Sequence, residues 1–218
     1  MNIKNLFYVV KLKFIALKQR LRPNGQMSIK DEVGRILYAI CGLTENKTIV
    51  EIGTWNGLGS STVIARGVNS GKQNAQVYGL EIFEKRVKQS KRNLRKYRFF
   101  NVIHGRIVDV DDLDSTQLRE EEIEWFESDK QNMSTTQNVL GLLPQQIDVL
   151  LLDGGEFSSY SEYLFLKDRG VRWLILDDVN VRKNRRVLAE AVTLGEFQLI
   201  WKSDERNGAA VLIRKDQF

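Results

Sequence analysis

Three aspartates at the ends of two apolar runs are the residues of this sequence with the clearest chemistry. Asp153 closes the run Asp148-Val-Leu-Leu-Leu-Asp153, and the pair Asp177 and Asp178 closes the run that begins at Arg172. If both runs are neighbouring parallel strands, their carboxylates meet at one edge of a sheet, where like charges repel and burial raises their pKa values. A hard divalent cation relieves that repulsion because it takes oxygen ligands. Magnesium suits the set best, since one histidine and one cysteine cannot supply a zinc cluster.

The residues around these aspartates leave two interpretations open. Asp177 and Asp178 could instead cap a turn or a helix start, which is a common use of aspartate. The polar side chains just beyond the pair could meet a polar or anionic substrate, and they are Asn180, Arg182 and Lys183.

A glycine-rich turn after a strand is the second candidate site. It lies in IVEIGTWNGLGSS, residues 49–61, with glycines at Gly53, Gly57 and Gly59. Because glycine has no side chain, it lets the backbone approach a ligand closely. The spacing G-xxx-G-x-G does not match the GxGxxG fingerprint of dinucleotide-binding turns, so the sequence does not predict a dinucleotide site here.

The elements that must position these residues alternate between strands and helices. Expected strands are residues 48–52, 76–81, 99–104, 148–153 and 172–177, and expected helices begin near Ser28 and span residues 60–67 and about 84–97. Such alternation predicts a parallel sheet with helices on both faces. The last two strands, residues 197–201 and 209–213, are joined by a short polar link and predict an antiparallel hairpin. The expected fold class is α/β, a Rossmann-like, doubly wound sheet of seven strands, mostly parallel with an antiparallel C-terminal hairpin.

The chain is predicted to hold one domain after a short extension. Residues 28–218 are expected to form that domain, with an insertion at about residues 110–146 that interrupts the alternation of strands and helices. The insertion carries an acidic helix-like piece, residues 118–126, followed by a polar stretch, residues 128–138. Because loops at strand ends build sites, we expect the insertion to contribute to one.

Residues 1–27 are predicted to form a basic helical extension with apolar residues at helical spacing. A basic amphipathic helix can lie on a membrane surface, so residues 1–22 could contact a membrane peripherally, or pack on the domain or on a second copy of the chain. The lysines within the segment argue against a transmembrane span, and no small-residue cleavage site marks a signal peptide. The single cysteine, Cys41, favours a reducing compartment, so we expect a cytoplasmic protein that could associate with a membrane surface.

The glycine turn resembles that of class I S-adenosylmethionine-dependent methyltransferases. These enzymes carry an acid-x-Gly-x-x-x-Gly turn at this place, and Glu51, Gly53 and Gly57 match it. They also end their sheet with an antiparallel hairpin like the one expected here. The resemblance covers about residues 45–214 and implies a methyltransferase with S-adenosylmethionine as its cofactor.

The resemblance implies a cofactor site along this turn and at the ends of the next strands. The turn would pass beside the amino-acid part and the ribose of the cofactor, and the hydroxyls of Ser60 and Ser61 could bind its carboxylate. Glu81 ends the second strand, where an acid can accept both ribose hydroxyls. The segment after the third strand falls where the family lines its adenine pocket. The predicted cofactor-binding residues are Glu51, Gly53, Thr54, Gly57, Ser60, Glu81, Gly105 and Arg106.

The three aspartates resemble the ligand set of metal-dependent O-methyltransferases. Enzymes of the catechol type, and those that act on antibiotic sugars, place acids after the fourth and fifth strands, where Asp153, Asp177 and Asp178 stand. The stretch DGGEFSSY that begins at Asp153 is similar to that of the sugar-modifying group. That group has a second acid where this chain has Gly155, and here Glu156 follows one residue later. The resemblance implies Mg²⁺ ligation by the three aspartates, with Asp153 as a catalytic residue. Glu156 is the candidate general base in place of the family's second acid, and it is the other predicted catalytic residue.

The predicted function is transfer of a methyl group from S-adenosylmethionine to a hydroxyl of a sugar, a glycan precursor or another small molecule, assisted by Mg²⁺. One alternative is a non-catalytic interaction protein that keeps the fold. A second is an RNA methyltransferase, suggested by the basic run at residues 85–98 and disfavoured because the Asn/Asp-Pro-Pro-aromatic motif is absent. A dehydrogenase is a third, and the glycine spacing argues against it.

Overall fold

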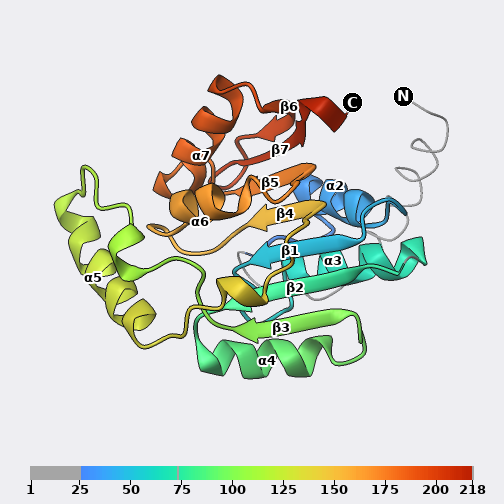
Figure 1. Cartoon of the computed structure of the whole chain (residues 1–218), viewed down its shortest axis with the longest axis horizontal. Helices are drawn as coiled ribbons and strands as arrows, with labels where there is room; N and C mark the ends of the chain where they lie inside the picture. The colour runs from blue at the N-terminus through green and yellow to red at the C-terminus, as the bar shows by residue number, and fades with distance from the viewer. Residues whose placement is uncertain (1–25, 73, 218) are drawn as a thin grey trace.

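One seven-stranded sheet organises the residues that the computed structural model describes, 26–72 and 74–217. Its strand order is β3-β2-β1-β4-β5-β7-β6. Strands β1 to β5 run parallel to one another, and β7 pairs antiparallel with both β5 and β6. The predicted fold class is therefore confirmed, a mostly parallel Rossmann-like sheet that ends in an antiparallel hairpin (Figure 1).

The strands follow the apolar runs of the sequence closely. Their bounds are β1 Thr48–Ile52, β2 Gln76–Glu81, β3 Phe100–His104, β4 Val149–Leu152, β5 Trp173–Asp177, β6 Phe197–Ser203 and β7 Ala209–Arg214. All four residues of β4 are buried, as a strand that is covered on both faces requires. β4 lies at the centre of the sheet, between β1 and β5.

Helices cover both faces of the sheet. Their bounds are α2 Glu32–Cys41, α3 Ser60–Gly71, α4 Glu84–Leu94, α5 Glu120–Ser134, α6 Ser159–Leu166 and α7 Arg182–Thr193, with 3₁₀ turns at Val110–Asp112, Leu140–Leu142 and Lys215–Gln217. Alternate residues of each strand point to opposite faces. Thus Leu151 of β4 packs in the core that contains α2, α3 and α4, whereas Leu150 and Leu152 pack in the core that contains α6 and α7.

Several helices differ from their predicted bounds. α3 continues four residues beyond its predicted end, to Gly71, and α4 ends earlier than predicted, at Leu94. The first helix of the domain begins at Glu32 rather than after Ser28, because Ser28 and Asp31 close a turn in which the Asp31 carboxylate accepts the Ser28 amide at 2.7 Å. In the insertion, α5 does not end near residue 126 but continues through Ser134, into the predicted polar stretch at residues 128–138. Three glutamates in its first turn favour the helix by interacting with the helix dipole, and the lysine and glutamine that follow are good helix formers.

The carboxyl ends of the parallel strands face the insertion. In Figure 1 the arrowheads of β1, β3 and β4 point toward the side on which α5 lies. Ligands of open α/β sheets bind at this edge, so a ligand site is expected there. Among the described residues no helix is both long and apolar enough to cross a membrane. Nearly all of the predicted extension lies outside the described residues, so the contacts expected of residues 1–22 stay predictions.

Candidate active site

A cavity of about 440 Å³ opens at the carboxyl edge of the sheet. Each of the five parallel strands contributes to its wall at or just after the strand's last residue, through Gly53, Glu81, Gly105, Asp153 and Asp177. Apolar side chains from several of these segments line part of the wall, and they include Ile52, Leu80, Ile107 and Met133. An apolar wall with a few convergent polar groups is typical of a small-molecule site.

The turn after β1 is shaped by glycines in the left-handed region of backbone conformation. Gly53 has φ +91°, and a Cβ placed on it would lie 2.2 Å from the carbonyl oxygen of Asp153. Gly57 has φ +78°, and a Cβ there would lie 3.0 Å from the Cα of Ser90 on α4. Only glycine fits both positions without strain. Gly53 lines the cavity, whereas Gly57 lets the turn pack against α4.

Glu81 presents a fixed carboxylate to the cavity. Its Oε2 accepts the Trp55 amide at 2.8 Å, and its Oε1 accepts the Phe83 amide at 3.0 Å. The residue is only 6% exposed, and this burial raises the pKa of its carboxyl, although the two amides act in the opposite direction. A carboxylate oxygen can accept more than one hydrogen bond, so both oxygens keep capacity for a ligand. Main-chain donors thus orient an acid at the wall of the site.

Glu51 and its neighbours support the turn from behind. The buried Glu51 carboxylate accepts hydrogen bonds from the hydroxyls of Ser60, at 2.6 Å, and Ser61, at 2.7 Å. Burial raises the pKa of Glu51 to about 8. The serine hydroxyls that were predicted to face the cofactor therefore point to Glu51 instead. Of the predicted cofactor-binding residues, four lie outside the described wall of the cavity, namely Glu51, Thr54, Gly57 and Ser60.

Gly105 and Arg106 both line the cavity, as predicted for residues after the third strand. Arg106 also has a use that the sequence did not reveal. Its guanidinium donates to the carbonyl oxygens of Met133, at 3.0 Å, and Thr136, at 2.9 Å, at the end of α5. A Cβ on Gly105 would lie 2.4 Å from Val139, so glycine is needed for the insertion to pack closely here. The segment after β3 therefore holds the end of α5 against the cavity.

The three aspartates converge, as their places after neighbouring strands require. One carboxylate oxygen each from Asp153, Asp177 and Asp178 lies within 4.8 Å of the others. Burial raises the pKa of Asp177 to about 7, and the nearby Asp153 contributes. Asp178 sits at φ +58°, in the left-handed region, so the chain turns sharply there and directs both members of the pair toward one site.

A lysine lies among these carboxylates. The Lys183 ammonium, from the start of α7, is 2.9 Å from Oδ1 of Asp153 and 2.6 Å from Oδ2 of Asp178. Its side chain is only 11% exposed. Burial disfavours the ammonium, but the two carboxylates outweigh that effect and raise the pKa of Lys183. A second cation, Arg206, lies 3.4 Å from Oδ2 of Asp177. Lys183 was noted as a substrate contact, and its pairing with the aspartates was not predicted.

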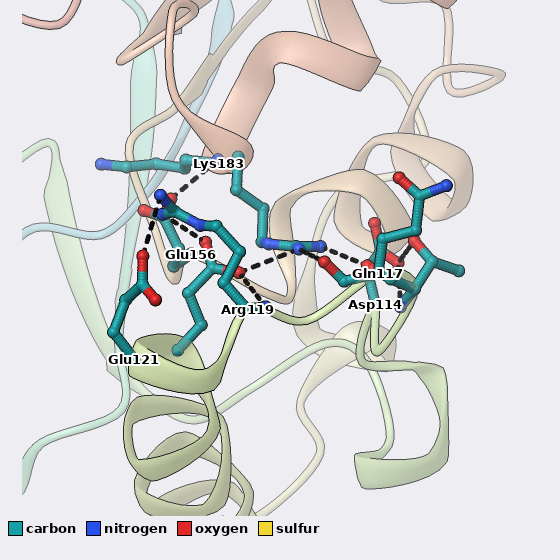
Figure 2. Close-up of polar contacts among 9 residues, drawn as sticks. Asp114, Gln117, Arg119, Glu121, Glu156 and Lys183 are labelled. Atoms are coloured by element: carbon teal, nitrogen blue, oxygen red, sulfur yellow. Dashed lines mark hydrogen bonds and ion pairs between the residues drawn. The ribbon is translucent and has the colours of Figure 1, made fainter.

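The acid predicted as general base lies beside the cavity rather than in its described wall. Glu156 accepts the backbone amide of Lys183 at 3.2 Å, a contact drawn in Figure 2. Two other acids do line the cavity, Asp129 of α5 and Glu162 of α6. Glu162 is 6% exposed, burial raises its pKa to about 7, and its Oε2 has no hydrogen-bond partner among the described residues. A carboxylate of this kind can exchange a proton near neutral pH.

A polar network holds the insertion to α7 (Figure 2). Arg182 donates to the carbonyl oxygens of Thr116 and Gln117, each at 2.8 Å, and pairs with Glu122 of α5 at 3.0 Å. Arg119 pairs with the other oxygen of Glu122 at 2.8 Å. Hydrogen bonds from the Arg119 side chain and amide, followed by that from Arg182, lower the pKa of Glu122 to about 2. Because α5 carries Asp129, this network helps to set one wall of the cavity.

No family model matches the sequence, and no curated protein matches it either. Solved structures do match the fold. The O-methyltransferase TomG from Streptomyces achromogenes, which takes part in tomaymycin synthesis and was solved with SAM, is 14% identical with a TM-score of 0.60, covering 98% of this chain and 99% of its own.

Two further structures agree. An O-methyltransferase from Bacillus cereus in complex with SAH is 14% identical with a TM-score of 0.58, covering 95% of this chain and 90% of its own. The SAH-bound methyltransferase PaMTH1 from Podospora anserina is 16% identical with a TM-score of 0.58. The match covers 96% of this chain and 88% of PaMTH1. At such identities the likeness establishes the architecture alone. The chain therefore has the class I fold of S-adenosylmethionine-dependent methyltransferases.

Proposed function

We propose that this protein is an S-adenosylmethionine-dependent O-methyltransferase that acts on a hydroxyl of a sugar, a glycan precursor or another small molecule. The observation that carries the proposal is that Glu81 and Gly53 both line the cavity at the carboxyl edge of the sheet. The Glu81 carboxylate is oriented by two backbone amides and can accept both hydroxyls of a ribose. Gly53 leaves the adjacent wall without a side chain, so the cofactor can lie close to the backbone.

The charge of the cavity is favourable for binding S-adenosylmethionine, the methyl donor. Six acidic side chains line it, Glu81, Asp129, Asp153, Glu162, Asp177 and Asp178, against three basic ones, Arg106, Lys183 and Arg206. The whole chain, by contrast, carries a net charge of +5. S-adenosylmethionine bears a sulfonium cation, and an acidic site attracts such a ligand through the field of its carboxylates. The apolar wall around Ile107 and Met133 offers a surface for the adenine ring.

The acceptor hydroxyl is proposed to bind at the other end of the cavity, near Asp153, Asp177 and Asp178. Their three carboxylate oxygens are close enough to hold one Mg²⁺ ion, which when bound would lower the pKa of an acceptor hydroxyl. Methyl transfer is in line, so the main task of the surrounding residues is to position donor and acceptor. Glu162 lines the same cavity and, with its pKa near 7, is a better placed proton acceptor than Glu156.

A sugar or glycan precursor is the proposed acceptor class. The similarity of DGGEFSSY, from Asp153 onward, to sugar-modifying enzymes supports it. The acceptor end is also rich in groups that bind hydroxyls. Asp129, Ser158 and Glu162 line the cavity and lie close to Gly154 or Gly155, directly after Asp153. Carboxylates and serine hydroxyls are the partners that the several hydroxyls of a sugar need.

Methyl transfer from labelled S-adenosylmethionine tests this function. Free sugars, nucleotide sugars and a catechol would serve as acceptors, each with and without EDTA, and Asp153→Ala would serve as the inactive control. We expect label in a sugar-type acceptor, reduced by EDTA and absent with the variant. Label in the catechol alone would contradict the acceptor class. Tight S-adenosylhomocysteine binding without transfer to any acceptor would instead favour a non-catalytic protein with this fold.

A further inference from the structure

Lys183 occupies the place that a divalent cation would need. Its ammonium bridges Asp153 and Asp178, at 2.9 and 2.6 Å, and both aspartates belong to the three-carboxylate set. Distances this short leave no room for an ion between the ammonium and the two oxygens it contacts. An ion that took all three aspartates as ligands would therefore have to displace the Lys183 ammonium.

The backbone that carries Lys183 is fixed, so displacement must come from its side chain. Asn184, the next residue, is fully buried and donates to the carbonyl oxygens of Leu152, at 3.0 Å, and Asp177, at 2.6 Å. These bonds tie the start of α7 to the ends of β4 and β5. The Lys183 amide is held as well, by Glu156 at 3.2 Å. The lysine side chain is a flexible stem of four carbons. Rotation about its bonds can therefore move the ammonium away from the aspartates while the helix stays in place.

Charge compensation points the same way. When all three carboxyls are ionised, Lys183 and Arg206 leave the cluster with a single excess negative charge. A divalent cation is attracted far more strongly to three uncompensated carboxylates than to a cluster that is already mostly neutralised. The lysine stabilises the cluster when no ion is bound. This stabilisation is lost when an ion displaces the ammonium, so the lysine lowers the affinity of the cluster for the ion.

We propose that Lys183 is a built-in competitor of the metal ion, which neutralises the aspartates when no ion is bound and must leave when one binds. The proposal rests on the Mg²⁺-assisted form of the proposed function. In that form of the function, Lys183 sets the concentration of divalent cation that is required to occupy the site.

Binding of Mn²⁺, measured by the EPR signal of the free ion, tests the proposal on the full chain. Lys183→Met removes the competitor, and Lys88→Met makes the same charge change at an exposed pair with Glu84, 2.7 Å away on α4. We expect Lys183→Met to bind Mn²⁺ at least tenfold more tightly than the wild type, and Lys88→Met to bind like the wild type. Equal affinity in Lys183→Met and wild type, or no binding by either, would overturn the proposal.

A second measurement uses the wild type alone, in case Lys183→Met does not fold. Amine-reactive labelling followed by mass spectrometry reports how accessible each lysine is. We expect 10 mM Mg²⁺ to increase labelling of Lys183 at least threefold and to leave Lys88 unchanged, and unchanged labelling of Lys183 would contradict the displacement. Titration of the same samples with S-adenosylhomocysteine keeps the two proposals apart. If the cofactor product binds but the cation results fail, only the inference about Lys183 is lost.

Discussion

The two ends of the cavity are built by different means. At one end, Glu81 is held by the backbone amides of Trp55 and Phe83, which are parts of the fold and do not move independently. At the other end, Asp153 and Asp178 are held by the side chain of Lys183. Main-chain donors preorganise a site, whereas a long side chain can exchange its place with a ligand. The comparison indicates a cofactor end that is ready in advance and an acceptor end that adjusts on binding.

The largest effect is expected at the acceptor end. Asp153→Ala removes one of the three converging carboxylates and one partner of Lys183. We expect the rate of methyl transfer to fall about 1,000-fold, since acid–base and metal assistance each contribute factors of this order. Affinity for S-adenosylhomocysteine should stay within about threefold, and circular dichroism should match the wild type. A parallel loss of cofactor affinity would show that the two ends are not separate.

The cofactor end is expected to respond through its backbone. Gly53→Ala places a Cβ 2.2 Å from the Asp153 carbonyl oxygen at φ +91°. We expect the free energy of unfolding in urea to fall by about 3 kcal/mol, because the clash and the backbone strain add. Gly141→Ala is the control, since a Cβ there meets nothing within 4 Å and should leave stability nearly unchanged. Equal stability of the two variants would contradict the tight fit of the turn.

The insertion reaches the acceptor end through Asp129 of α5, and Arg182 helps to hold the insertion in place. Arg182→Met removes the donor to Thr116 and Gln117 and one partner of the buried Glu122. We expect a loss of about 2 kcal/mol in unfolding free energy, less than for an unpaired buried charge because Arg119 still pairs with Glu122. Arg185→Met, at an exposed position of the same helix, should change stability by less than about 0.5 kcal/mol.

Acid should weaken the same network by a smaller amount. Glu122 has its pKa lowered from 4.5 to about 2, so its contribution to stability is complete above the higher value and is lost as the pH falls toward the lower one. Between about pH 6 and about pH 4, the wild type should lose about 1 kcal/mol more unfolding free energy than Glu122→Gln. Urea unfolding at both pH values measures the difference. Identical losses would place Glu122 outside the network that holds the insertion.

The sequence predicted the parts of the molecule that depend on local pattern. Apolar runs located the strands, the polar link located the hairpin, and strand-end positions were enough to bring Asp153 toward Asp177. Contacts between elements far apart along the chain were missed. Neither the Arg182 network nor the pairing of Lys183 with Asp153 has a local signal, because each depends on the angle at which α7 meets β4 and the insertion.

The extent of α5 and the environment of Glu162 were also missed, because both depend on contacts between elements that are far apart along the chain. The polar residues at the end of α5 carry little apolar periodicity, and tertiary contacts such as those of Arg106 with Met133 hold that end in place. Glu162 looks like an ordinary helical glutamate in the sequence. Only the fold shows that it is buried in the wall of the cavity with an oxygen left without a partner among the described residues.

Calorimetric titration with S-adenosylhomocysteine tests the central claim most directly. The account predicts one site per chain in the wild type, and an affinity at least tenfold weaker in Glu81→Ala, because hydrogen bonds to a charged group are worth roughly 1.5–3 kcal/mol. Glu84→Ala, at an exposed glutamate three residues along, should bind like the wild type. No binding heat in the wild type, or equal affinity in Glu81→Ala, would contradict the claim that this acid and the glycine turn hold the cofactor.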